Sequence, residues 1–389
     1  MAPFSVLKIG RIIPLVVGLI LAYHVVMQVE GGSAATSVRL TEEEELELER
    51  QLNILNKPPI KTMHTRRGVI YDCIEFYKQP AFDHPLLKNH TILKKDEATP
   101  TTTLHTTLTS EIEGCPEGTV PIRRTTKEDL IRAKYLSAPS NAPGDHEYRA
   151  GISLQIQGER FFGTHGIANV WQPKVNPDQF TAAETAIRAG HIEEANEIRF
   201  GWMVYPGLYG DNLTSMFGYW TGDGSHQTGC YNTLCPGFVQ VDPKYPIDMY
   251  FVDISVTGGT QYALRLEISM ERETGHWWLT LEEKIKIGYW PSNLFKLLGL
   301  GADYIYWGGR VKSGKDGITP VMASGNLPDR WPDTTGYYAE LQYKKNDDTM
   351  MIPSNEVQFI VDCKESYNAL WDNEHTILHF GGPGGGNCA

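Results

Sequence analysis

The sequence predicts a mostly β protein, built from short antiparallel strands in a sandwich or barrel. Two observations support this prediction. The chain of 389 residues contains 19 tyrosines, 9 tryptophans and 38 glycines, and aromatic residues favour strands whereas glycine favours the tight turns between them. From residue 147 onward, short runs with strand character alternate with turn residues, at a spacing typical of a sandwich or barrel. A part with helical segments precedes this β region.

The bulk composition is that of a globular protein with a buried core. Hydrophobic residues make up 41% of the chain and charged residues 21%, and the length allows two domains. The formal net charge is −12. Because a phosphate backbone attracts basic surfaces, this charge argues against nonspecific nucleic-acid binding, and we expect no nucleic-acid partner.

The first residues have the pattern of a targeting segment. Lys8 and Arg11 form a short basic region, residues 12–29 are mostly apolar, and small residues surround Ala34. This order of basic, apolar and small residues is typical of a secretory signal. We therefore interpret residues 1–34 as a signal peptide that is cleaved near Ala34.

An uncleaved signal anchor is the alternative interpretation of this segment, because its apolar run approaches the length that spans a bilayer. His24 and Gln28 interrupt the run and weaken that interpretation. With the signal removed, we expect no stable membrane association. The predicted location is extracellular.

The six cysteines of a secreted chain predict disulfides, since their number is even and the compartment is oxidising. The number alone leaves the pairing open, and proximity in sequence favours three pairs. These are Cys73–Cys115, Cys230–Cys235 and Cys363–Cys388. No histidine pair follows Cys230 and Cys235 at finger spacing, so a metal site there is disfavoured. We expect no metal and no other cofactor.

Two helices are predicted before the β region. Thr41 opens the first with a capping box, and the prolines at 58–59 end it. The second is capped at Thr125 or Thr126 and runs to about Leu136.

A linker is predicted between the two parts of the chain. Residues 137–146 are small, polar and rich in proline and glycine. We therefore place an N-terminal domain at 40–136 and the β domain at 147–389. A linker of this composition is also a natural cleavage site.

Strand character is concentrated in six regions of the β domain. The composition of another segment, 180–189 with the sequence FTAAETAIRA, favours a helix instead. The six predicted strand regions are 159–170, 197–205, 249–255, 261–270, 277–281 and 337–343.

Two sequons, at Asn89 and Asn212, predict N-linked glycans on surface loops of a secreted protein.

Several long motifs resemble the neprosin family of plant glutamic peptidases, over roughly residues 40–389. The resemblance implies a sandwich of two antiparallel sheets with a cleft on a concave face, a strand at 180–189, the same cysteine pairs, and a removable N-terminal activation domain. For a secreted protein of a plant family it also implies a location in the cell wall or apoplast, with the vacuole as a second option. The motifs that carry it are LNKPPIKT at 55–62, QPAFDHPLLKNHT at 79–91, CPEGTVPIRRT at 115–125 and the aromatic, glycine-rich run at 201–240.

The resemblance also locates two catalytic positions. The family's earlier motif reads Ile-Glu-Ala-Gly-Trp and its later motif reads Trp-Gly-Gly-Glu. The matching stretches here are IRFGW at 198–202 and WGGR at 307–310. Both positions that carry the family's catalytic glutamates are therefore arginines, Arg199 and Arg310.

Arginine cannot replace either glutamate chemically. A glutamic peptidase of this kind uses one carboxylate to activate water and a protonated carboxyl group to donate to the substrate carbonyl. A guanidinium group stays protonated and cannot act as a base. We therefore predict a protein with the fold of a post-proline-cleaving endopeptidase that has lost most or all of this activity.

Two other functional hypotheses remain open. Glu197 lies two residues before Arg199, so both face the same side of a strand, and a bulge could bring Glu197 into the cleft. The second hypothesis is thus an active acid-pH endopeptidase that cuts after proline with Glu197 and another carboxylate. The third is a storage or defence wall protein without a specific ligand.

Two arginines in one groove favour an anionic ligand, because guanidinium forks match carboxylates. The candidate ligands are an acidic peptide, a peptide C-terminus and an acidic wall polysaccharide. Trp220, Tyr289, Trp290 and Trp307 are expected to form the aromatic walls of the cleft. The opposing interpretation assigns these tryptophans to the core.

Overall fold

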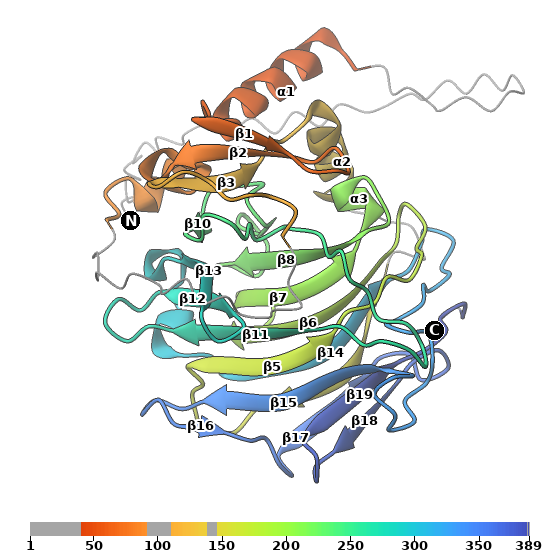
Figure 1. The fold of residues 1–389 in the computed structure, drawn as a ribbon. Coiled ribbons are helices and arrows are strands. Elements are labelled where there is room, and N and C mark those ends of the chain that lie inside the picture. The colour runs from red at the N-terminus through yellow and green to blue at the C-terminus, as the bar shows by residue number, and fades with distance from the viewer. Residues whose placement is uncertain (1–39, 92–109, 138–145, 387, 389) are drawn as a thin grey trace, which may run out of the picture. The chain divides into compact units, whose positions relative to one another are not determined.

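The computed structural model describes residues 40–91, 110–137, 146–386 and 388 (Figure 1). The predicted signal peptide and all but the ends of the predicted linker lie outside these residues. The described residues from Glu43 onward belong to one compact unit. No helix in this part of the chain is long and apolar enough to cross a bilayer.

Both predicted N-terminal helices are present, and their ends follow the expected signals. The first buries Leu48 and Leu55. At the start of the second, the backbone N–H of Asp129 donates to Thr126 Oγ1, while Asp129 Oδ2 accepts from the backbone N–H of Thr126, which is a reciprocal cap. The helices are α1 (Glu42–Leu55) and α2 (Lys127–Ser137).

A small antiparallel sheet and three 3-10 turns lie between these helices in the sequence. The sheet has the order β1-β2-β3. Its strands are β1 (Lys61–His64), β2 (Ile70–Glu75) and β3 (Thr119–Arg123), and the turns are η1 (Phe76–Lys78), η2 (Pro80–Asp83) and η3 (Pro85–Leu87).

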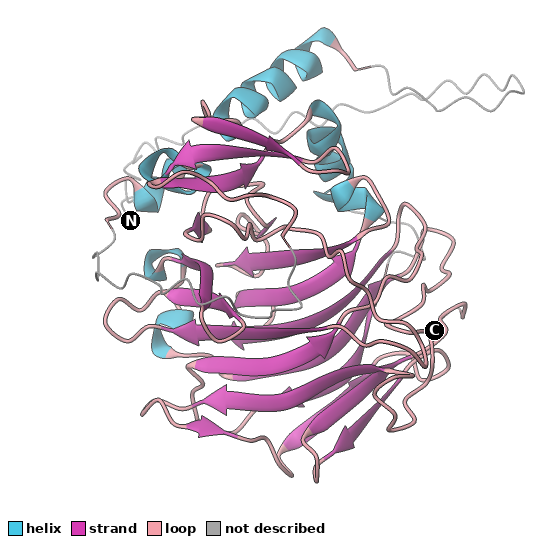
Figure 2. Cartoon of the chain, in the orientation of Figure 1, coloured by secondary structure: helices cyan, strands magenta, loops and turns pink. Residues whose placement is uncertain are grey.

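The β domain contains two antiparallel sheets, as predicted (Figure 2). One sheet has seven strands in the order β17-β4-β14-β6-β7-β8-β9. Its strands are β4 (Glu147–Leu154), β6 (Phe180–Ala189), β7 (Asn196–Val204), β8 (Thr214–Thr221), β9 (Cys230–Tyr231), β14 (Tyr304–Lys312) and β17 (Val357–Val361).

The second sheet has nine strands, eight of them in the order β10-β13-β12-β11-β5-β15-β19-β18, with β16 paired to β15. The strands are β5 (Gly163–Asn169), β10 (Val239–Gln240), β11 (Ala263–Met270), β12 (Trp277–Leu281), β13 (Ile285–Trp290), β15 (Gly336–Lys344), β16 (Met350–Met351), β18 (Asn368–Asp372) and β19 (Ile377–Gly381). The remaining short helices are α3 (Pro206–Tyr209), η4 (Ser292–Leu294) and η5 (Leu298–Leu300).

The main core takes its side chains from both sheets. Ile198, Phe200 and Trp202 of β7 are fully buried there, as are Trp277 and Trp290 of the nine-stranded sheet. Because successive side chains of a strand point to opposite faces, the intervening residues of β7, including positions 197 and 199, face away from this core.

Segment 180–189 forms β6, so the helix that its composition favours is wrong and the strand implied by the family resemblance is right. It pairs along its full length with β14 on one side and β7 on the other. Its small side chains suit this central position, where Ala183 and Ile187 are fully buried. Tertiary pairing outweighs the high helix propensity of alanine and glutamate, because tertiary context overrides intrinsic propensity.

Five of the six predicted strand regions contain strands, and the prediction for 249–255 is wrong. This segment makes a single bridge, between Tyr250 and Ser215. Two backbone bonds frame the bridge, from Met216 N–H to Met249 O at 2.7 Å and from Phe251 N–H to Thr214 O at 2.9 Å. The segment therefore meets only the first residues of the β8 edge.

The predicted cysteine pairing is confirmed in all three cases, Cys73–Cys115, Cys230–Cys235 and Cys363–Cys388. Disulfides of this kind are typical of oxidising compartments. The first pair lies before the predicted linker and the other two lie after it. No disulfide therefore links the N-terminal part to the β domain.

Noncovalent contacts connect these two parts at β10. Gln79 presents its side-chain amide to the backbone of Gln240, accepting from its N–H at 2.8 Å and donating to its carbonyl at 3.1 Å. Both residues are buried. The Gln79 amide thus satisfies the backbone at the sheet edge much as a neighbouring strand does.

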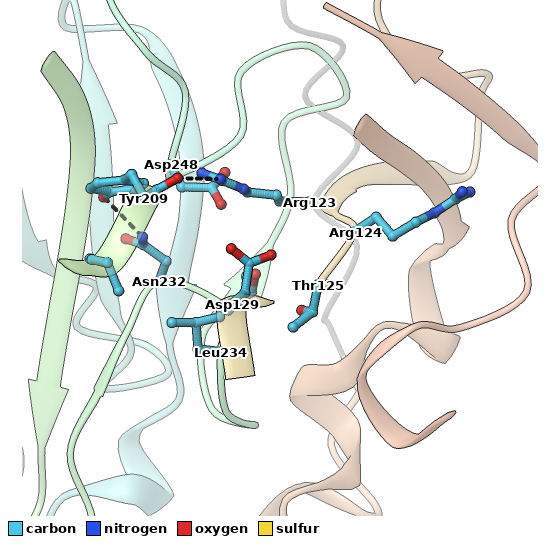
Figure 3. A pocket seen from close by; sticks show the side chains of 10 residues that line it. Arg123, Arg124, Thr125, Asp129, Tyr209, Asn232, Leu234 and Asp248 are labelled. Carbon is cyan, nitrogen blue, oxygen red and sulfur yellow. Dashed lines mark hydrogen bonds between the residues drawn. The ribbon is translucent and has the colours of Figure 1, made fainter. Parts of the chain in front are cut away.

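A narrow cavity of about 20 Å³ lies at a second contact (Figure 3). Arg123 Nη2 donates to the backbone carbonyl of Tyr209 at 3.3 Å, and Asn232 Nδ2 donates to the Tyr209 hydroxyl at 3.0 Å. Burial raises the pKa of the neighbouring Asp248, although the charge of Arg123 opposes this rise. A cavity of this size holds about one water molecule, so it is no ligand site.

Candidate functional site on the outer face of the seven-stranded sheet

The strand register brings Arg199 and Arg310 to one face of the seven-stranded sheet. Arg199 of β7 lies opposite Ala186, and Arg310 of β14 lies opposite Ala182, on the two sides of β6. Positions 182 and 186 are an even number of residues apart, so they share a face. This face points away from the main core and is called the outer face below.

Arg310 is held by two carboxylates from neighbouring strands. Its Nε donates to Glu184 Oε1 of β6 at 2.7 Å, and its Nη1 donates to Glu147 Oε2 of β4 at 2.8 Å. The side chains of Arg310 and Glu184 are only 10% and 2% exposed, whereas that of Glu147 is 43% exposed. The Arg310–Glu184 pair is thus buried, and Glu147 closes it toward solvent.

Glycines on both neighbouring strands leave room for the Glu184 side chain. Glu184 lies opposite Gly201 of β7 and Gly308 of β14. A Cβ atom at Gly201 would lie 2.0 Å from the carbonyl oxygen of Ala183, which no side chain can tolerate without backbone movement. Gly308 has a φ of +151°, which strongly favours glycine.

Arg199 forms a second ion pair on the same face. Its Nη2 and Nε donate to Glu197 Oε2 at 2.7 and 3.0 Å, and its guanidinium carbon lies 4.8 Å from the ring centroid of Tyr219. Glu197 therefore does share the face of Arg199, as the two-residue period predicts. No bulge is needed to bring Glu197 to this face, but one oxygen of its carboxylate is already hydrogen-bonded to Arg199.

Two acids of the outer face, Glu197 and Glu147, have lowered pKa values and are held in their ionised form. Burial alone favours the neutral acid, but the charges of Arg199 and Arg310 outweigh it and lower the pKa of Glu197. Burial likewise favours the neutral form of Glu147, but the charge of Arg310 and the weaker effect of Arg199 outweigh it and lower the pKa of Glu147. Neither carboxyl group is therefore set up to donate a proton.

A cavity of about 320 Å³ opens on the outer face. Its lining combines four arginines with three acids, two tyrosines and two aliphatic side chains. These residues are Arg149, Arg188, Arg199, Arg310, Glu147, Glu197, Asp362, Tyr304, Tyr306, Ala186 and Ile192. The cavity is large enough for part of an extended ligand, and its charges are nearly balanced.

Comparison with protein families matches both parts of the chain. The family model described as Neprosin covers residues 177–383, and the one described as Neprosin activation peptide covers residues 62–152. The chain belongs to the neprosin family. Arg199 and Arg310 both lie inside the Neprosin match, and Glu147 lies inside the match to the activation peptide.

Solved structures similar to this neprosin-family protein include two peptidases and the CBM40 of a sialidase. Scytalido-glutamic peptidase with a peptide-based transition state analog covers 61% of this chain and 98% of its own, at 11% identity and a TM-score of 0.36. SCP-B, a member of the Eqolisin family of peptidases, covers 61% of this chain and 97% of its own, at 10% sequence identity and a TM-score of 0.29. The Ruminococcus gnavus IT-sialidase CBM40 bound to alpha2,6 sialyllactose covers 44% of this chain and 90% of its own, at 9% sequence identity and a TM-score of 0.23.

The aromatic residues predicted to line the cleft lie elsewhere. Trp220, Trp290 and Trp307 belong to the main core and Tyr289 to a smaller cluster, all at most 2% exposed. Trp307 stands three residues before Arg310 and therefore points to the opposite face, where its Nε1 donates to Thr164.

The sequence-based prediction of the site does not include several residues of the outer face. Tyr304 and Tyr306, rather than the predicted tryptophans, are the aromatic residues of the cavity wall. They precede Arg310 by six and four residues on β14, so the two-residue period of that strand is the signal that could have found them. Glu184 and Glu147, which bind Arg310, lie on other strands, so the period of β14 does not point to them.

The two predicted glycosylation sites lie on exposed positions. Asn89 and Asn212 are both exposed, and Asn212 Oδ1 accepts a hydrogen bond from the backbone N–H of Val175. Exposure permits a glycan at each position, and their use stays a prediction.

Proposed function

We propose that this neprosin-family protein lacks the two-glutamate peptidase chemistry and uses its outer face to bind a carboxylate-bearing peptide. One observation carries the proposal. Both positions where the family resemblance expects catalytic glutamates are arginines, and each arginine is hydrogen-bonded to a carboxylate.

The missing chemistry follows from the protonation states of the face. Peptide hydrolysis of this type needs one carboxylate that activates water and one carboxyl group that gives a proton. Arg199 and Arg310 stay charged at any working pH, since their carboxylate partners raise both pKa values further despite burial. Loss of acid–base catalysis lowers a rate by about 10²–10⁴ for each group.

Glu197 is the best remaining candidate for a catalytic carboxylate, and its environment argues against that role. Its Oε2 accepts two hydrogen bonds from Arg199, so this oxygen faces a cation. Its lowered pKa also reduces its strength as a base. An acid peptidase based on Glu197 would require this ion pair to open.

The proposed setting is extracellular. The apolar N-terminal segment followed by small residues, the three disulfides and the two exposed sequons support secretion. In this setting the ligands that the outer face meets are secreted peptides or acidic wall polymers.

The test is hydrolysis of a proline-rich peptide by the purified secreted protein, from about pH 2.5 to 7, with products identified by mass spectrometry. Glu197→Gln serves as the comparison variant, since it removes the best remaining candidate for a catalytic carboxylate without changing the size of the side chain. We expect no cleavage by either protein. Cleavage by the natural protein that disappears in Glu197→Gln would establish the acid peptidase instead.

A further inference from the structure

The arginines of the outer-face cavity differ in their partners. Three of the four are hydrogen-bonded to carboxylates. Arg149 Nε donates to Asp362 at 2.9 Å, Arg199 pairs with Glu197, and Arg310 bridges Glu184 and Glu147. Within the described residues, the side chain of Arg188 donates no hydrogen bond and forms no ion pair.

Arg188 nevertheless has a defined position. Its guanidinium carbon lies 4.1 Å from the ring centroid of Tyr304, a distance at which the cation is attracted to the ring face. Its Nε is buried and has no hydrogen-bond partner. Buried polar groups of native proteins are normally satisfied, and this one belongs to a charged group that lines a cavity.

We propose that Arg188 is the anchor for the C-terminal carboxylate of a bound peptide, which lies in the outer-face cavity beside Tyr304 and Ile192. This inference deepens the proposed function, on which it rests, by naming the ligand group and its receptor. The guanidinium fork matches a planar carboxylate and can donate two parallel hydrogen bonds to it.

The charges around Arg188 favour a single carboxylate over a polyanion. Glu197 lies directly opposite Arg188 in the strand register, and Glu147 and Asp362 also line the cavity. A polymer with an anion on each unit would bring its second charge close to one of these acids, at an electrostatic cost. A peptide carries its terminal charge once, and a neutral chain follows.

The cavity also suits the rest of such a peptide. Beside the charged groups, its lining includes Tyr304 and the exposed side chain of Ile192, together with Tyr306 and Ala186, which are each 1% exposed. A polar anchor with an apolar wall is the usual composition of a small-ligand site.

The test compares two pools of N-acetylated tetrapeptides of uncharged residues, one with free C-terminal carboxylates and one with amides. Equilibrium dialysis against the full secreted protein, quantified by mass spectrometry, measures retention of each pool. We expect the acid pool to be retained about tenfold more strongly, as befits hydrogen bonds to a charged group. Equal retention of the two pools, or retention of neither, would overturn the inference.

Two variants assign this preference to Arg188. Arg188→Met should abolish the preference for free acids over amides. Arg188→Lys keeps the positive charge but loses the two parallel N–H donors of the guanidinium group, so it should reduce the preference severalfold. Arg272→Met is the matched control, because Arg272 is paired with Asp348 outside the cavity and both side chains are about half exposed. A preference that survives in both Arg188 variants would contradict the assignment.

The same samples separate this inference from the proposed function. Mass spectrometry of the retained peptides reports any cleavage, which would refute the loss of peptidase chemistry without affecting the preference for acids over amides. Oligogalacturonate added as a competitor tests the other class of ligand. Its tight, Arg188-dependent binding together with weak binding of the peptide acids would overturn the peptide assignment.

Discussion

Arg310 and Glu184 form a buried ion pair across β14 and β6, with Arg310 Nε donating to Glu184 Oε1 at 2.7 Å. Gly201 and Gly308 flank Glu184 on the neighbouring strands, so the pair lies in a notch of the outer face. Removing one member of such a pair leaves an uncompensated charge in a poorly hydrated place. The consequences of this arrangement can be measured.

Arg310→Met should destabilise the protein by about 3–5 kcal/mol, because Glu184 then lies buried without its cation. The free energy of unfolding in guanidinium chloride measures this loss. The double variant Glu184→Gln/Arg310→Met is the matched control and should recover much of the stability. A loss below about 1 kcal/mol in the single variant would show that the pair is exposed to solvent in solution.

Gly201→Ala should also destabilise the protein, by about 1–3 kcal/mol or more, because the new Cβ would meet the carbonyl oxygen of Ala183 at 2.0 Å. Thermal unfolding reports the change as a lower midpoint. Gly299→Ala is the control, since a Cβ there meets no atom within 4 Å. Equal midpoints for the two variants would contradict the close approach of β6 and β7.

Stability should fall as the pH drops from about 6.5 to about 4, in part through His276. Burial and the neighbouring His90 lower the pKa of His276 to about 4, and its Nδ1 accepts the backbone N–H of Ser292. The unfolded chain therefore takes up this proton first on acidification. The contribution is fully present above about pH 6.5 and is lost toward pH 4.

The expected loss from His276 is about 1–2 kcal/mol, since partial exposure reduces the effect of the shift. Chemical unfolding at a series of pH values measures it. His276→Asn should flatten the slope between pH 4 and 6.5, whereas a change at the exposed His226 should not. An unchanged slope in His276→Asn would assign the acid sensitivity to other groups.

The N-terminal part should remain bound to the β domain after the chain is cut between them. No disulfide connects the two parts, so a protease site inserted within 138–145 leaves only noncovalent contacts such as the buried Gln79–Gln240 pair. We expect the fragments to coelute in size-exclusion chromatography. Gln79→Ala, which leaves the Gln240 N–H without an acceptor, should weaken the complex by about 1–3 kcal/mol. Separation of the unaltered fragments on cutting would contradict this.

Local signals in the sequence were sufficient for much of the fold. The threonine cap at the start of α2, the Cys230–Cys235 pair and the shared face of Glu197 and Arg199 all follow from short-range rules. Such rules act within a few residues, through caps, turns and the two-residue period of a strand. These rules predict where helices and strands lie and which side chains share a face of a strand, but not which strands pair with each other in a sheet.

The partners of Arg310 could not be predicted for this reason. Glu184 and Glu147 lie 126 and 163 residues away in the chain, and only the strand order β4-β14-β6 brings them to Arg310. The assignment of 180–189 to a helix failed for a related reason, because its alanines fit a central strand between two neighbours. Trp307 lies three residues before Arg310 on β14, so the two-residue period of that strand places it on the core face rather than in the cavity wall.

The central claim is that Arg199 and Arg310 block glutamic peptidase chemistry on an otherwise suitable face. The most direct measurement is hydrolysis of a proline-rich peptide at about pH 3 to 7 by Glu184→Gln/Arg199→Glu/Arg310→Glu, in which Glu184→Gln removes the acid that Arg310 now balances. The matched control carries Gln at positions 199 and 310. We predict acid-pH cleavage by the Glu variant and none by the control or the natural protein. Cleavage by the natural protein, or a folded Glu variant that stays silent, would contradict the claim.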